Sequence, residues 1–154
     1  RSGRVTGVQT CALPISMIKK QFTLYLENKP GALSKVTRQL GRAKVNIEGI
    51  SVAESTDVSL VQIVASNAAT TRRILKQLSI PFTVQDVTLL PLENVPGALC
   101  SVVSELARRK VNINYVYATG SAGKSPAVDY VVIGAPDLDK VEACWEQVCS
   151  RHRK

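Results

Sequence analysis

The stretch LENKPGAL, residues 26–33, decides the fold, because it is repeated with one substitution as LENVPGAL at residues 92–99. The similarity extends beyond this phrase. At a constant offset, fifteen of the twenty-four residue pairs between 24–47 and 90–113 are identical. A repeat of this length marks one supersecondary unit present in two copies, whereas a solenoid needs about three or more. The sequence therefore predicts two related domains, which we place at residues 17–87 and 88–150.

Residues 1–16 lie outside this pattern. The string VTGVQTCALPI, residues 5–15, resembles the translation of a common short-read sequencing adapter, and Met17 is the only methionine. We therefore expect residues 1–16 to be a non-native segment and leave them out of the fold prediction. Residues 151–154 are expected to form a basic tail.

Composition excludes several classes of protein. The formal net charge is +8, from 20 Lys and Arg against 12 Asp and Glu. Without Arg1 and Arg4 it is 18 − 12 = +6. No apolar run approaches the roughly 18 residues of a membrane span. Cys100, Cys144 and Cys149 show no metal-ligand spacing, so we expect reduced thiols and a cytoplasmic protein.

Hydrophobic periodicity predicts the order βαββαβ for the first domain. Phe22, Leu24 and Leu26 alternate with polar residues, which is typical of a half-buried strand, and helical spacing follows through residues 31–44. The remaining predicted elements are strands at 47–55, 58–66, 81–87, 87–94, 113–119 and 127–135, and helices at 68–79, 98–109 and 137–151, the last with Asp137 as its N-cap. The predicted fold class is α+β, with two ferredoxin-like units of which the second lacks its last strand.

The repeated phrase spans a strand end, a tight turn and a helix start. Gly31 permits the turn, and the first N–H groups of the helix, those of Ala32, Leu33 and Ser34, have no intrahelical acceptor. Such a helix start attracts an anion, and a carboxylate suits it. The amides of Asn28 and Asn46 add donors and acceptors for an amino acid. The competing interpretation is a plain turn in which the asparagines satisfy backbone groups.

Both copies resemble the ACT domain, a small regulatory module of amino-acid metabolism. The resemblance rests on Asx, Pro-Gly, small-Leu and Asn-Ile in each copy, covers nearly all of 17–150, and is greatest to stand-alone proteins of two ACT domains. It implies a non-catalytic homodimer that binds a small amino acid and passes its occupancy to a partner such as a metabolic enzyme. The implied ligand-binding residues are Asn28, Gly31, Ala32, Leu33, Asn46, Ile47, Asn94, Gly97, Ala98, Leu99, Asn112 and Ile113.

The family also implies that the second asparagine reaches the ligand across an interface. Related serine sensors carry a polar histidine two residues before the Asx, where this chain has Leu26 and Leu92. That departure puts serine in doubt. It favours an apolar amino acid, or a site that reads its ligand mainly through the backbone.

Other functions have weaker support in the sequence. We expect no catalytic residues, no metal and no cofactor, because residues 120–125, GSAGKS, lack the spacing of a phosphate-binding loop and His152 stands in the basic tail. The first copy also resembles the regulatory subunit of acetolactate synthase, which has only one such domain. Nucleic-acid binding is disfavoured, because the basic runs at 72–73 and 108–110 come with no recognition motif and few aromatic residues.

Overall fold

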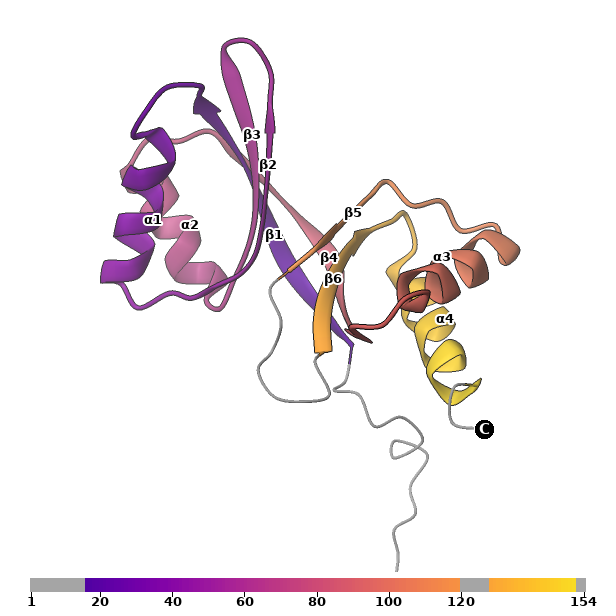
Figure 1. Cartoon of the computed structure of the whole chain (residues 1–154). Coiled ribbons are helices and arrows are strands. Elements are labelled where there is room, and N and C mark those ends of the chain that lie inside the picture. Colours follow the sequence, from indigo (N-terminus) through magenta and orange to yellow (C-terminus); the bar gives the residue numbers. More distant parts are fainter. Residues whose placement is uncertain (1–15, 120–127, 152–154) are drawn as a thin grey trace, which may run out of the picture. The chain divides into compact units, whose positions relative to one another are not determined.

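The computed structural model describes residues 16–119 and 128–151. The chain forms two compact units, Lys19–Asp86 and a unit that begins at Val87 and includes Met17 and Ile18 (Figure 1). Within the described residues, no helix is long and apolar enough to cross a membrane.

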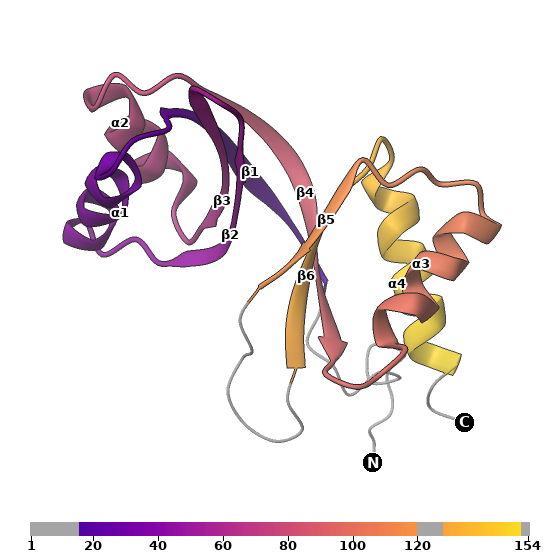
Figure 2. The same ribbon diagram turned by 45° about the horizontal axis from the view of Figure 1, so that its top comes forward.

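The first unit has the predicted βαββαβ order. Its elements are β1 (Met17–Glu27), α1 (Ala32–Arg42), β2 (Ile47–Glu54), β3 (Val58–Ala65), α2 (Ala68–Gln77) and the start of β4 (Phe82–Glu93). The strands are ordered β2-β3-β1, with antiparallel pairing, and the N–H of Tyr25 donates to Pro81 O beside the start of β4. Both helices cover one face of these strands (Figures 1 and 2).

The core of this unit follows from the sequence pattern. Phe22 and Leu24, which alternate in β1, are fully buried, and Val36 and Leu40 of α1 pack into the same cluster. Lys44 ends the helix in the left-handed conformation at φ 58°, and the Val45 N–H donates to Leu40 O at 2.9 Å. This is a Schellman-type end, which directs the chain from the helix into β2.

The second unit repeats the plan. It contains the rest of β4, α3 (Ala98–Arg108), β5 (Tyr115–Ala118), β6 (Val128–Gly134) and α4 (Leu138–Arg151), with its strands ordered β4-β6-β5. Both helices lie on one face of these strands (Figure 2). The predicted N-cap is confirmed, because Asp137 Oδ1 accepts from the Lys140 N–H at 3.2 Å. Up to Arg151 no strand follows α4, as the predicted fold requires.

A buried tryptophan links α4 to β4 by a hydrogen bond in the second unit. Trp145 is 5% exposed, and its indole Nε1–H donates to the carbonyl oxygen of Pro91 at 3.0 Å. Trp145 also packs in the second core with other residues of α4. The hydrogen bond adds a directional contact to that packing, because the buried carbonyl has this donor in place of water.

Two expectations, on the strands of residues 81–94 and on the thiols, are corrected by the structure, and a third is left untested. The predicted strands 81–87 and 87–94 are one continuous strand, β4. The segment 1–16 lies outside the described residues except for Ser16, which is buried and donates its hydroxyl to Glu142 Oε1 at 3.4 Å. Cys100 and Cys144 are free thiols, but Cys149 is disulfide-bonded, so the expectation of three reduced thiols is wrong.

Candidate functional site

The two repeated junctions have nearly the same backbone geometry. Gly31 and Gly97 precede their helices at φ 87° and φ 88°. An added Cβ at either glycine would meet no atom within 4 Å. Glycine is therefore required by the left-handed backbone rather than by crowding within the chain, and the space beside each turn is open.

The helix starts leave N–H groups for a ligand. Neither α1 nor α3 has a side-chain cap. The Ala32 N–H donates to Lys29 O at 3.4 Å, and the Ala98 N–H donates to Val95 O at 3.3 Å. These two N–H groups are therefore engaged, whereas the sequence predicts that the Ala32 N–H is available to a ligand. In the part of the chain that the structure describes, the next two N–H groups of each helix have no acceptor; they belong to Leu33, Ser34, Leu99 and Cys100. These groups carry the partial positive charge of the helix start.

Asn28 already has structural partners. Its backbone N–H donates to Asp57 O at 3.0 Å and its Nδ2 to Ser55 O at 3.3 Å, while its Oδ1 accepts from Ser59 Oγ at 3.4 Å. The amide therefore holds the hairpin between β2 and β3 against the junction. A second N–H on Nδ2 remains for a ligand. Among the described residues, the side chain of Asn94 has no hydrogen-bond partner.

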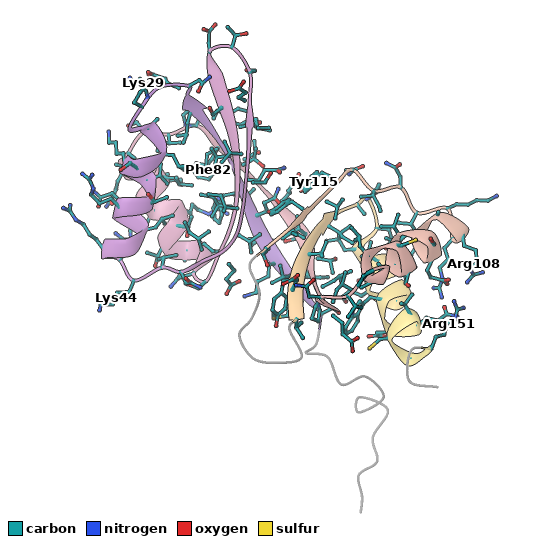
Figure 3. The ribbon with its side chains drawn as sticks, viewed as in Figure 1. Lys29, Lys44, Phe82, Arg108, Tyr115 and Arg151 are labelled. Carbon is teal, nitrogen blue, oxygen red and sulfur yellow. The ribbon has the colours of Figure 1, made fainter. Side chains whose placement is uncertain are left out.

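The second pair of asparagines lies elsewhere. Ile47, next to Asn46, pairs with Ala65, while Gln21 pairs with Val64, so Asn46 lies near the first residues of β1. Asn28 follows the last residue of that strand, seven residues beyond Gln21 or roughly 23 Å at 3.3 Å per residue. Lys29 and Lys44 mark the two ends of α1 (Figure 3). One unit therefore cannot bring Asn28 and Asn46 to the same ligand.

The second unit has the same separation. Asn114 donates its N–H to Gly134 O at 2.8 Å, which places the start of β5 beside the end of β6. Asn112 lies just before this point and donates Nδ2–H to Asn114 Oδ1 at 3.2 Å. Glu93, next to Asn94, pairs with Val128 at the other end of β6. Asn94 and Asn112 are therefore also at opposite ends of their strands.

Most apolar candidates pack into the cores. Ala32, Leu33 and Ile47 contact the first core, and Ala98 and Ile113 contact the second. These side chains are partly buried by the cores, so their backbone groups are the more accessible to a ligand.

Leu99 is the exception at 42% exposed, and Val95 beside it is 53% exposed. At the first junction the corresponding surface residue is Lys29, which pairs with Glu27. The hydrogen bond from Lys29 lowers the pKa of the Glu27 carboxyl. The second junction thus presents apolar surface where the first presents an ion pair.

The other sequence candidates do not form a catalytic or metal site. Residues 120–125 and His152 lie outside the described residues. Within the described residues, no three His, Cys, Asp or Glu side chains are grouped to hold a metal ion. The rings of Tyr115 and Tyr117 stack at 6.5 Å, and Tyr115 lies against Gly134, where an added Cβ would come within 2.3 Å of the ring. The ring of Tyr115 therefore packs over Gly134 and occupies the space that a side chain there would need.

One charged network was missed by sequence reasoning. Glu105 of α3 is 4% exposed, and its oxygens accept from Arg108 Nε at 3.1 Å, Arg109 Nε at 3.0 Å and Arg151 Nη1 at 3.2 Å. Arg108 and Arg151 come together from two helices (Figure 3). They line a pocket together with Ser101, Ser104, Glu105 and Val148. The hydrogen bond from Arg108 is the largest cause that holds the pKa of Glu105 at about 2.

This network predicts a pH-dependent contribution to stability. Because folding lowers the pKa of Glu105 from 4.5 to about 2, its stabilising effect is complete above about pH 4.5 and is lost as the pH falls toward 2. We expect Glu105→Gln to lower the urea midpoint at neutral pH, with a difference from the parent that shrinks on acidification. The control is Glu146→Gln at an exposed position of α4. A difference that stays constant between pH 5 and 2.5 would contradict the assignment.

Comparison with known proteins gives consistent matches. A family model described as an ACT domain pair matches residues 17–128. Protein BT0572 from Bacteroides thetaiotaomicron has a similar structure, with 30% sequence identity and a TM-score of 0.75, over 86% of this chain and 89% of that chain. No curated protein matches.

Two further similar structures are regulatory subunits of aspartate kinase. The subunit from Thermus thermophilus has 16% identity and a TM-score of 0.64, over 89% of this chain and 96% of that one. The subunit from Thermus flavus has 13% identity and a TM-score of 0.57, over 93% and 99% of the two chains. At these identities the likeness concerns the fold.

Proposed function

The chain belongs to the family of ACT domain pairs, and from this premise we propose that it is a non-catalytic regulatory protein that binds a small amino acid at its strand–turn–helix junctions. The observation that carries the proposal is the open, uncapped helix start behind Gly31 and Gly97. Two N–H groups there suit the carboxylate of an amino acid. The second Nδ2 N–H of Asn28 can donate to the same carboxylate, and an asparagine amide oxygen can accept from the ammonium group.

We propose that a second copy of the chain completes the site. Asn28 and Asn46 lie at opposite ends of β1, so an Asn46 that contacts the ligand at Asn28 must come from elsewhere. The edge strand β2 supports pairing, because Ile50 and Val52 are 40% and 52% exposed on it. An exposed apolar edge favours association with another chain. The proposal is therefore a homodimer with ligand sites shared between copies.

Backbone N–H groups, rather than side chains, make most of the proposed contacts to the ligand. Leu26 and Leu92, which replace a polar residue of the serine sensors, are buried in the two cores at 6% and 7% exposure. Neither side chain is available to a ligand. The exposed Val95 and Leu99 beside the second junction favour an amino acid with an apolar side chain.

Regulation would follow from population shift. A ligand that contacts two copies stabilises the assembly that forms its site, and a partner that distinguishes the two assemblies senses the ligand. An enzyme of amino-acid biosynthesis is the proposed partner, since two similar structures are regulatory subunits of aspartate kinase. The fold that this chain shares with those subunits supports an enzyme as the class of partner.

The ligand can be found with a thermal-shift panel of the common amino acids. A ligand that binds only the folded state adds about 2.7 kcal/mol at 100 times its dissociation constant. The best ligand of the panel then serves in calorimetric titrations of the full chain.

A complementation experiment tests the shared site. We expect Asn28→Ala and Asn46→Ala each to weaken binding by about tenfold or more, the scale of a hydrogen bond to a charged group. Mixed after unfolding and refolding, the two variants should regain sites of parental affinity. Each mixed dimer has one intact first-junction site, so about a quarter of the first-junction sites recover in a random mixture.

Two controls interpret the result. Ser59→Ala removes the hydroxyl that donates to Asn28 Oδ1 and keeps the amide, so it measures the effect of loosening the hairpin alone. Gln77→Ala removes an exposed amide of α2 outside the predicted set. If the mixture gains no sites, the shared homodimeric site is wrong. If neither single variant loses affinity, the junction is not the binding site.

A further inference from the structure

The positive charge of the described residues is concentrated on one surface. Most lysines and arginines outside α1 and α2 pair with an acid, as Lys19 does with Glu48 at 3.0 Å. The cations without an ion pair in the described part of the chain are Lys35, Arg38, Arg42, Lys44, Arg72, Arg73, Lys76 and Lys110. All of these except Lys110 lie on or next to α1 and α2, and we call these seven the basic helical face.

Acidic residues are missing from the same segments. Neither residues 28–47 nor residues 66–85 contain an aspartate or a glutamate. The nearby negative charges of Glu27 and Glu48 are engaged by Lys29 and Lys19. The basic helical face therefore carries an uncompensated positive potential, which attracts an anionic partner.

The spacing of these cations forms two rows. Lys35, Arg38 and Arg42 recur at steps of three and four residues along one side of α1, a row of about 10 Å at 1.5 Å per residue. Arg73 and Lys76 are exposed on the adjacent helix α2. The axes of packed helices lie about 8–10 Å apart, a spacing of the same order as the groove widths of a nucleic-acid duplex, about 6 and 12 Å in B-DNA.

The surface lacks the features of a protein-binding site. None of the exposed large apolar residues of the described chain lies on α1 or α2. Stable protein interfaces depend on apolar and aromatic anchors, whereas phosphate contacts need cations and N–H donors. Insertion into a lipid bilayer would also need apolar side chains. Only Arg72 is partly engaged, with its guanidinium 6.0 Å from the ring centre of Phe22.

The second repeat shows that the fold does not require these charges. At the same offset, Lys35 and Arg38 of α1 correspond to Ser101 and Ser104 of α3. Both helices form with the same length and cap geometry. Lys35 and Arg38 are therefore particular to the first unit and need an explanation other than folding, whereas Arg42 and Lys44 recur in the second as Arg108 and Lys110.

We propose that the basic helical face binds the phosphate backbone of a duplex nucleic acid, without sequence preference. The cations contact phosphates on either side of a groove and release bound counterions, so affinity depends steeply on salt. The proposal is independent of amino-acid binding, because the face contains none of the asparagines and glycines of the two junctions.

The test uses the full chain and a fluorescent duplex of about 20 base pairs in anisotropy titrations between about 50 and 200 mM salt. The variant Lys35→Ser with Arg38→Ser gives α1 the residues that α3 carries. We expect its affinity at low salt to fall by about tenfold or more, and the slope of log affinity against log salt to become shallower by about 1.8, or 0.9 per lost phosphate contact.

The control changes the net charge equally in the second unit. Lys110→Asn with Lys140→Gln removes two cations there, and asparagine suits the left-handed backbone of residue 110 at φ 58°. Affinity and salt slope should change little. An equal loss in both double variants would show that overall charge, not this face, attracts the duplex.

Other outcomes would overturn the proposal. Non-specific binding to DNA has dissociation constants of about 100 μM or less. If the parent protein binds the duplex at low salt with a dissociation constant above about 100 μM, it lacks the site. Tighter binding to phosphatidylserine vesicles than to the duplex would assign the face to a membrane. Circular dichroism and amino-acid titration of each variant verify that the fold and the junctions are intact.

Discussion

Gly31→Val is expected to weaken amino-acid binding at the first junction by roughly 10- to 100-fold and to destabilise the fold by about 2 kcal/mol. The stability loss arises because Gly31 has φ 87°, a conformation that β-branched residues rarely adopt. The binding loss has a separate cause. The new side chain would fill the open space beside the N–H groups of Leu33 and Ser34, where the carboxylate is expected to bind.

Gly41→Ala is the matched control for this prediction. An added Cβ at Gly41 also meets nothing within 4 Å, but the residue lies inside α1 without a positive φ. The second repeat already has Ala107 there. We expect a stability gain of about 0.5–1 kcal/mol and no change in affinity. Urea unfolding and calorimetry measure both quantities. Unchanged affinity in Gly31→Val and Gly97→Val would place the ligand elsewhere.

Trp145→Ala is expected to lower the free energy of unfolding of the second unit by about 3–5 kcal/mol. The variant leaves a cavity in the second core at the place of the indole ring. It also leaves the buried Pro91 carbonyl without its indole donor. Trp145→Phe keeps an aromatic ring and loses the donor, so about 1–3 kcal/mol is expected for it.

Glu146→Ala is the control, because this neighbouring residue is exposed on α4 and surface changes stay within about 0.5 kcal/mol. The measurement is chemical unfolding followed by circular dichroism, with tryptophan fluorescence as a second probe for the parent. If Trp145→Phe is as stable as the parent, the hydrogen bond to Pro91 contributes nothing and packing alone holds α4.

The sequence by itself determined the repeated fold and most of its cores. Alternation in β1, helical spacing in α1 and the Pro-Gly turn are local patterns, and each copy confirms the other. Phe22, Leu24, Val36 and Leu40 are buried as these patterns predict. Such features depend on the period of the backbone, 2 residues in a strand and 3.6 in a helix, so they can be read without knowing any distant contact.

The tertiary structure alone decided which of the predicted site residues can act together. The amide of Asn28 is engaged by a hairpin about thirty residues away, and Asn46 lies at the other end of the same strand. The carboxylate of Glu105 meets Arg151 across 46 positions of sequence. The unpaired cations of α1 and α2 form one surface only because two helices cover the same face (Figure 1). The physical reason is that strand register and helix packing bring together residues far apart in the chain, and neither is encoded in a short segment.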